Sequence, residues 1–270
     1  MVDTVSIILA VVSLVGSLIA AGFTGWVSFY IDQVKRRSEA KALIHKYRDP
    51  LTLAAFDLQS RLYGLVQLDL LHYHEDEEKK NLIYLYSAFL VGQYLSWTYI
   101  LRRQGQFLNL STDKSNNLNR RLDEVLSTIT NEFSLDNRQG ENPWMLWRGQ
   151  QMAIGELMTK EEQGQLYCMG FAAFAHRYNT EPEFKHWFHP IEDGISMLVD
   201  ARAKQNRIAT YRLRRVQHLL IDLVNLLDPV RLQSSANKQL KVDPAHECLC
   251  SGCPSRKQDY LVSKAPKLAV

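Results

Sequence analysis

The residues best suited to chemistry lie close together near the C-terminal end of the chain. Cys248, Cys250 and Cys253 fall within six residues, and His246 precedes them by two positions. Thiolates and an imidazole are ligands of Zn²⁺ and of cluster iron. Zinc sites usually draw their ligands from two separated pairs, whereas this spacing is Cys-x-Cys-x2-Cys in one short segment. We therefore expect no bound cofactor, and a zinc or iron site at His246, Cys248, Cys250 and Cys253 is an alternative.

The same segment admits two interpretations without a metal. Arg256 and Lys257 would draw it to an anionic membrane surface, where cysteines are acylated. The interpretation that we favour is that the thiols are free in a mobile tail. The chain has four cysteines in all and no recognisable disulfide framework, which fits a reducing compartment.

A second set of polar side chains, Arg148, Gln151 and Glu156, falls in a predicted helix that also contains Gly149 and Gly155. A glycine inside a helix costs about 1 kcal/mol relative to alanine, so another interaction should offset it. We favour close helix packing around the two glycines. The alternative is a groove in which the three polar side chains bind a ligand or a partner, and this makes them the candidate cofactor-binding residues.

The chain contains no recognisable catalytic motif. It has no glycine-rich phosphate loop, His-Glu-x-x-His helix, nucleophile elbow or kinase motif. Its net charge of +3 and the lack of a basic stripe with aromatic residues argue against nucleic-acid binding. We therefore predict a non-enzymatic interaction or scaffold protein, with no catalytic residues. The alternatives are a membrane-tethered metal-dependent enzyme, using the tail thiols or the region of His186, and an oligomeric membrane effector or pore.

The first element that positions these residues is a predicted membrane span. No residue between Asp3 and Asp32 is charged, and as a helix this run would extend roughly 42 Å, more than the ~30 Å hydrocarbon core. A cleaved signal peptide would need a basic region before a shorter apolar run. Four basic residues follow the run at once: Lys35, Arg36, Arg37 and Lys41. The positive-inside rule therefore predicts a single-pass protein in the lipid bilayer, with its N-terminus outside and its C-terminal domain in the cytoplasm.

Small residues recur along one face of the predicted span, at Ser13, Ser17, Ala21 and Gly25. Rows of this kind let helix backbones approach closely in lipid. They favour self-association into a homo-oligomer, or binding of a helical partner protein.

The rest of the chain is predicted to be an all-α bundle of about seven helices, because apolar residues recur at spacings of three and four. Asp49-Pro50, Asn142-Pro143 and Pro190 are typical of helix starts, as are capping boxes at Thr159/Glu162 and Thr180/Glu183. The last helix carries apolar residues from Ala209 to Leu227 and should end at Asp228-Pro229.

The uncharged run from Asn81 to Leu101 contains many hydroxyl groups, so we expect a buried bundle helix there, with a second membrane span as the alternative. The predicted organisation is then an anchor over 1–31, a charged juxtamembrane helix or linker over 32–50, a cytoplasmic bundle over 51–228, and a flexible basic tail that contains cysteines over 229–270.

Overall fold

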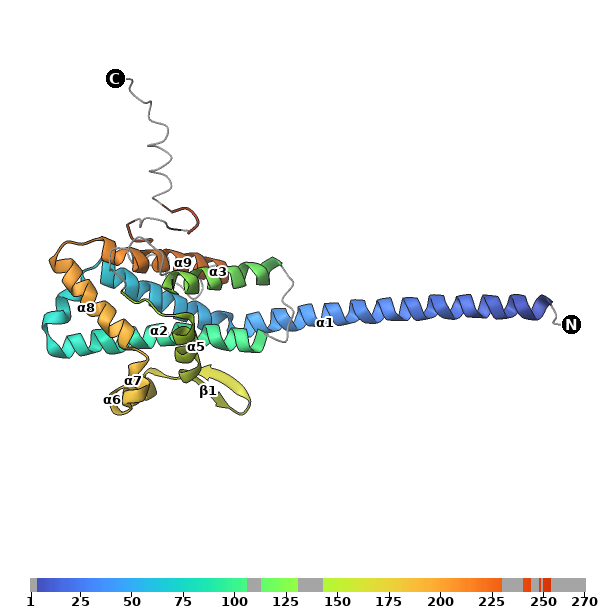
Figure 1. Cartoon of the computed structure of the whole chain (residues 1–270), viewed down its shortest axis with the longest axis horizontal. Helices are drawn as coiled ribbons and strands as arrows, with labels where there is room; N and C mark the ends of the chain where they lie inside the picture. The colour runs from blue at the N-terminus through green and yellow to red at the C-terminus, as the bar shows by residue number, and fades with distance from the viewer. Residues whose placement is uncertain are drawn as a thin grey trace, which may run out of the picture.

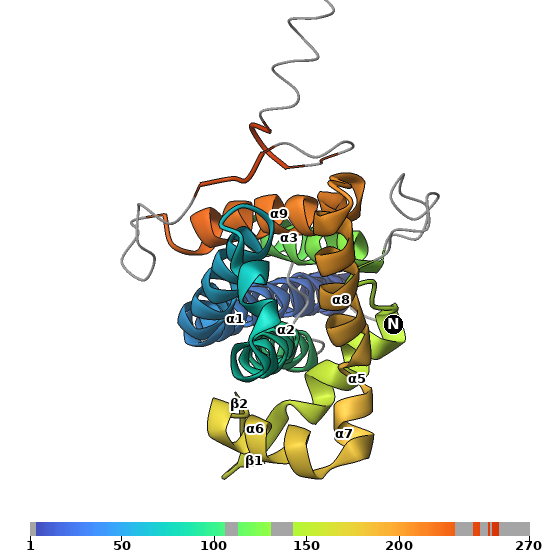
Figure 2. The same ribbon diagram turned by 90° about the vertical axis from the view of Figure 1, so that its left-hand side faces the viewer.

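The computed structural model describes residues 4–105, 113–130, 143–229, 240–243, 248 and 250–253. Over these residues the fold is all-α with one small hairpin, as the apolar spacing predicts. A long helix projects from a bundle of shorter helices (Figures 1 and 2). The elements that follow this helix α1 (Thr4–Val66) are η1 (Leu70–Glu75), α2 (Glu77–Gly105), α3 (Asp113–Thr130), α5 (Arg148–Leu157), β1 (Thr159–Glu162), β2 (Gln165–Cys168), α6 (Phe171–Thr180), α7 (Pro182–His186), α8 (His189–Ala203), η2 (Ile208–Thr210) and α9 (Tyr211–Leu227).

Helix α1 joins the predicted anchor and the first bundle helix in one continuous element. The helix start predicted at Asp49-Pro50 is therefore wrong, because Pro50 lies inside α1. Proline in a helix interior costs about 3 kcal/mol. Burial outweighs this cost, because Leu51, Leu58 and Leu62 lie in the core and each buried leucine contributes roughly 1.5–3 kcal/mol.

The N-terminal part of α1 is exposed to the surroundings. The stretch Val12–Arg36 is long and apolar enough to cross a membrane, and none of it is buried. Leu14, Ile19 and Phe23 are each more than 60% exposed. Within the described residues α1 is the one helix with such a stretch.

Helices α2 and α9 pack against the bundle part of α1, and α3 packs against α9. The uncharged middle of α2 is a core helix, since Leu90, Tyr94 and Ile100 are all buried. Among the polar residues that set this run apart from a membrane span, Tyr94, Ser87, Ser96 and Thr98 lie inside the bundle, whereas Tyr86 is exposed.

The predicted start of α8 and the predicted end of α9 are confirmed, whereas Ala209 lies in η2 and not in α9. Pro190 occupies the first turn of α8, and α9 ends at Leu227, directly before Asp228. The apolar seam of α9 faces the core, with Leu213 and Leu220 almost fully buried.

The capping box predicted at Thr159 and Glu162 is wrong, because these residues form strand β1 of an antiparallel hairpin with β2. Gln163 and Gly164 connect the strands with φ values of 51° and 75°. Two positive φ values are typical of the type I′ turn that fits the twist of a two-residue hairpin. The turn geometry therefore overrides the capping pattern.

Two further predicted helix starts are wrong. The capping box at Thr180 and Glu183 is wrong, because Thr180 is the last residue of α6 and α7 begins at Pro182 with Glu181 as its N-cap. The helix start predicted at Asn142-Pro143 is also wrong. Trp144 has φ 58°, which is a turn conformation, and α5 begins only at Arg148. Trp144 packs against Gly194 of α8, where an added Cβ would lie 2.4 Å from the indole Cδ1. Packing between distant segments therefore sets this backbone conformation.

The glycines of α5 differ in their surroundings. An added Cβ at Gly155 would lie 2.9 Å from the carbonyl oxygen of Leu95 and 2.9 Å from the Cβ of Tyr99, both on α2. At Gly149 no atom lies within 4 Å of the added Cβ. The packing predicted for this helix is therefore confirmed at Gly155 and not at Gly149.

This difference predicts opposite effects of alanine at the two glycines. Gly155→Ala should lower the free energy of unfolding by about 1–3 kcal/mol, because α2 and α5 must move apart. Gly149→Ala should raise it by up to about 1 kcal/mol, because alanine is the better helix former. Denaturant unfolding of the detergent-solubilised protein measures both. Equal effects of the two substitutions would contradict the packing that we describe.

Candidate metal centre

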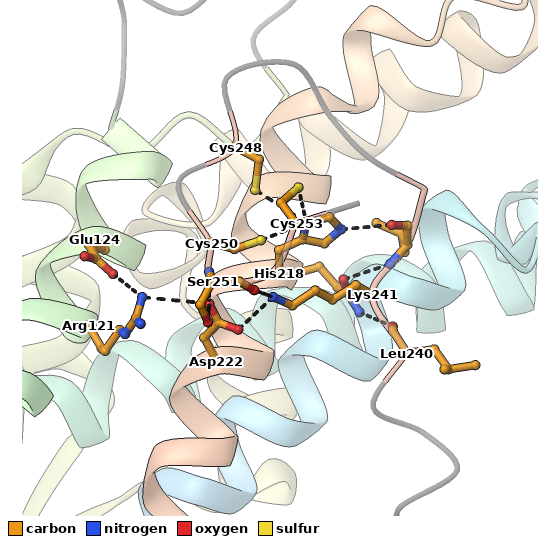
Figure 3. A network of polar contacts seen from close by, with 12 residues as sticks. Arg121, Glu124, His218, Asp222, Leu240, Lys241, Cys248, Cys250, Ser251 and Cys253 are labelled. Carbon is orange, nitrogen blue, oxygen red and sulfur yellow. Dashed lines mark hydrogen bonds and ion pairs between the residues drawn. The ribbon is translucent and has the colours of Figure 1, made fainter. Parts of the chain in front are cut away.

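The side of α9 that faces away from its apolar seam carries a buried polar stripe. Arg214, His218 and Asp222 recur at every fourth position, and all three are buried. Residues four apart lie on one face of a helix, so their side chains point to the same neighbour. That neighbour is the end of the described chain, which returns across α9 (Figure 3).

Residues 240–243 form the first part of this covering segment. The Gln217 side chain donates from Nε2 to the carbonyl oxygen of Leu240 at 2.9 Å and accepts at Oε1 from the Val242 amide at 3.2 Å. Arg214 donates from Nη1 to the carbonyl oxygen of Asp243 at 3.2 Å. The side chains of α9 thus bond the backbone of this segment.

The second part of the covering segment brings three cysteines to one histidine. Nδ1 of His218 lies 3.4 Å from Sγ of Cys248, 3.5 Å from Sγ of Cys250 and 3.7 Å from Sγ of Cys253. All four side chains are buried, and the four ligand atoms lie within 4.8 Å of one another. One metal ion could therefore touch all four atoms, and the cluster could hold a metal.

The hydrogen bond at Nε2 of His218 determines which nitrogen of the ring carries the proton. Nε2 lies 2.9 Å from the carbonyl oxygen of Val242. A carbonyl oxygen can only accept, so Nε2 carries the proton and donates. Neutral imidazole then has its lone pair on Nδ1, which faces the sulfur atoms. Histidines that bind metals are held by a second-nitrogen hydrogen bond of this kind.

Asp222 holds the cysteine loop in place from one turn further along α9. Its Oδ2 accepts from the amide of Ser251 at 2.7 Å and from the Ser251 hydroxyl at 2.9 Å. Gly252 follows with φ 64°, a left-handed conformation that glycine adopts without strain. The turn places Cys250 and Cys253 on the same side, toward His218 (Figure 3).

Lys241 supplies a positive charge next to the cluster. Its Nζ donates to Oδ1 of Asp222 at 2.7 Å and to the carbonyl oxygen of Ser251 at 2.6 Å. Burial alone would lower the pKa of Lys241, but the Asp222 carboxylate outweighs it and the pKa is raised. Arg121 of α3 lies 3.8 Å from the same carboxylate. The polar network therefore links α3, α9 and the returning segment.

Two thiols of the cluster, those of Cys248 and Cys250, interact directly. The thiol of Cys248 donates a hydrogen bond that lowers the pKa of Cys250 and raises its own. The charge of Lys241 also lowers the pKa of Cys250. A thiolate is the form of cysteine that binds metals, and this arrangement favours it at Cys250.

The predicted ligand set is thus found in part. Cys248, Cys250 and Cys253 come together, whereas His246 lies outside the described residues. His218 occupies the fourth position, and the sequence reasoning missed it. Its signal was the polar stripe on α9, since a buried face with charged residues needs a polar partner.

The fourth cysteine lies elsewhere. Cys168 ends β2, is partly buried and donates to the carbonyl oxygen of Met169 at 3.5 Å. Burial raises its pKa to about 11, so its thiol stays protonated at neutral pH. Because Cys168 lies outside the cluster, its substitution is a control for substitutions of the three clustered cysteines.

The candidate cofactor-binding residues also come together. Arg148, Gln151 and Glu156 line one open groove of about 470 Å³ between α2, α3 and α5. Gln151 is buried and has a structural role, since its Nε2 lies within 3.0 Å of two carbonyl oxygens and of the Thr130 hydroxyl. Arg148 donates from Nη2 to the Ser127 hydroxyl at 2.8 Å, so its other donors and the side chain of Glu156 remain for contact with a ligand.

Comparison of the chain with models of protein families, with curated proteins and with solved structures finds no match.

Proposed function

We propose that this protein is a membrane-anchored helical interaction module whose bundle is closed by one structural Zn²⁺ ion. His218, Cys248, Cys250 and Cys253 would be the four ligands. The observation that carries the zinc assignment is the set of distances between Nδ1 of His218 and the three sulfur atoms. Zinc–sulfur bonds of about 2.3 Å and a zinc–nitrogen bond of about 2.05 Å, at tetrahedral angles, place nitrogen and sulfur about 3.6 Å apart. The three distances, 3.4, 3.5 and 3.7 Å, agree with this value.

The same distances favour a single ion over an iron–sulfur cluster. In a cluster with two irons, the four protein ligands divide between the metals, and ligands of different irons lie far apart. Here every ligand atom lies within 4.8 Å of every other. An arrangement this tight suits one tetrahedral ion.

The ligand set also favours a structural role over a catalytic one. Catalytic zinc keeps a coordination position open for water or substrate, with three protein ligands. Four protein ligands fill the tetrahedral shell, and the exposed fraction of these side chains is 5% or less. The alternative of a metal-dependent enzyme at this centre is therefore the weaker proposal.

Positively charged side chains offset most of the negative charge that a filled ligand shell would carry. Three thiolates around a divalent ion leave one negative charge, and the ammonium group of Lys241 lies next to Cys250. Asp222 adds one negative charge and Arg121 adds one positive charge. Glu124 pairs with Arg121 at 2.9 Å and adds one further negative charge, so the network carries one net negative charge, at its partly exposed edge.

The anchor supports the membrane part of the proposal. The exposed apolar stretch of α1 is long enough to cross the bilayer, and by the positive-inside rule the basic residues that follow it favour a cytoplasmic bundle. Self-association through the small residues of α1, or a helical partner, is the interaction that we propose for the span. The bundle then serves as a cytoplasmic scaffold at the membrane surface.

Metal analysis tests the centre directly. We expect the purified full-length protein to contain about one Zn²⁺ per chain, with three sulfur atoms and one nitrogen at bonding distance in X-ray absorption. Cys250→Ser should remove most of the metal, because serine is a poor zinc ligand at neutral pH.

Cys168→Ser is the matched control, and it should keep the metal content of the natural chain. The proposal fails if the natural chain purifies without metal under reducing conditions and binds no added Zn²⁺. Equal loss of metal in the two serine variants would also contradict it.

A further inference from the structure

The groove between α2, α3 and α5 is lined by three arginine side chains. Arg102 and Arg103 come from the last turn of α2, and Arg148 is the first residue of α5. Asp123 of α3 lies 2.6 Å from Arg102 and 3.8 Å from Arg148, so two guanidinium groups share one carboxylate. The groove therefore carries more positive than negative charge on its arginine side.

Arg103 contributes further N–H donors to the groove. Its Nη1 contacts the Tyr99 hydroxyl at 3.4 Å, and it forms no ion pair with any carboxylate in the described part of the chain. Glu156 lines the groove as well and reduces its net charge to about one positive charge. Guanidinium groups present planar pairs of donors that match phosphate oxygens.

The groove lies at the end of the bundle from which the predicted membrane span emerges. Helix α2 runs antiparallel to α1, with Ser87 beside Arg61 and the ring of Trp97 6.2 Å from that of Tyr47 (Figure 1). Each residue of a helix advances the chain by about 1.5 Å. Arg102 and Arg103 thus lie about 8 Å beyond Tyr47, on the side where α1 leaves the bundle.

The distance from these arginines to the lipid follows from the same rise. Tyr47 lies about 24 Å along α1 from Ile31, the last residue of the uncharged run. If α1 continues straight, the last turn of α2 lies about 15 Å from the end of that run. An arginine side chain extends about 6 Å, and the potential of an anionic membrane surface decays over about 8 Å at physiological salt. The remaining gap of about 9 Å is close to one decay length, so the arginines lie at the edge of the field of the headgroups.

We infer that this arginine groove, defined by Arg102, Arg103 and Arg148, binds the phosphate group of an anionic phospholipid. The inference rests on the membrane anchoring proposed above. The phosphate accepts charge-assisted hydrogen bonds from Arg103 and Arg148. The groove, with a volume of about 470 Å³, has room for a headgroup. Such binding would hold the bundle against the bilayer in addition to the anchor.

Binding is tested with the full-length protein in a nonionic detergent by isothermal titration calorimetry. The probe is dioctanoyl phosphatidic acid, which carries a phosphomonoester. Dioctanoyl phosphatidylcholine has the same acyl chains without net charge, and inorganic phosphate has the charge without the chains. We expect saturable binding of phosphatidic acid, at least tenfold tighter than that of either comparison ligand, and weaker at higher salt.

Arg103→Gln and Arg148→Gln should each weaken the binding of phosphatidic acid about fivefold to tenfold, since each removes a charge-assisted contact. Arg120→Gln is the control, because Arg120 is exposed on α3, contacts Asn117 at 3.0 Å and does not line the groove. Circular dichroism of each variant verifies that it folds.

Three results would overturn the inference. Phosphatidic acid that binds no better than phosphatidylcholine shows that the groove has no phosphate site. Inorganic phosphate that binds as tightly as the lipid assigns the groove to a soluble ligand. An effect of Arg120→Gln equal to that of Arg103→Gln attributes binding to general charge. The detergent assay does not require the span, so a failed groove is distinguishable from a failed anchor, which membrane extraction measures separately.

Discussion

Withdrawal of the metal from the folded protein should release residues 240–243 and the three clustered cysteines from α9 and lower the melting temperature by on the order of 10 °C. Binding of a structural zinc ion is coupled to the folding of the segment that supplies its ligands. Without the ion, three buried sulfur atoms and Nδ1 of His218 lose their shared partner. The segment is then held only by polar contacts such as those of Arg214, Gln217 and Asp222. A loss of about 4 kcal/mol corresponds to roughly 10 °C in a protein of this size.

The measurement is a thermal unfolding curve of the detergent-solubilised protein before and after treatment with a zinc chelator under reducing conditions. Added Zn²⁺ should restore the original midpoint. His218→Gln should melt at the temperature of the chelated protein and should not respond to Zn²⁺, whereas Cys168→Ser should behave like the natural chain. An unchanged midpoint after complete removal of the metal would show that the centre has no structural role.

Two arginines introduced into the predicted span should make the protein extractable from the membrane by alkaline carbonate. The double substitution Leu14→Arg, Val15→Arg places two charges near the middle of the uncharged run, and each costs roughly 3 kcal/mol in the bilayer. The natural chain should stay in the membrane pellet after alkaline carbonate extraction. The double variant should appear largely in the supernatant.

Ala42→Arg is the control for the added charge. Ala42 is exposed on the same helix, beyond the uncharged run, so this variant should stay in the pellet. Natural protein that is released by carbonate, or a mature chain that lacks the apolar run, would contradict the anchor. The melting temperature of the bundle should be the same in all three proteins, because the exposed span makes no buried contact in the described structure.

Regular features were the ones that sequence reasoning predicted correctly. The apolar spacing of α9, the Pro190 start of α8 and the buried, hydroxyl-rich middle of α2 each follow from a local periodicity. The continuation of α1 through Pro50 and the turn at Trp144 were not predicted, because packing against distant segments outweighs the local preference of the sequence. The penalty for Pro50 inside α1 is about 3 kcal/mol, and burial of the leucines that follow it exceeds that amount.

The amino-acid sequence by itself determined the candidate thiol ligands and the long uncharged run. Both depend on residue types that are close neighbours in the chain, so spacing reveals them. Only the tertiary structure decided that His218, thirty residues before Cys248, completes the cluster. A metal site needs ligand atoms a few ångströms apart, and the reversal of the chain across α9 provides that proximity. Local sequence could not choose among the eight histidines, because the choice depends on which helix face the returning segment covers.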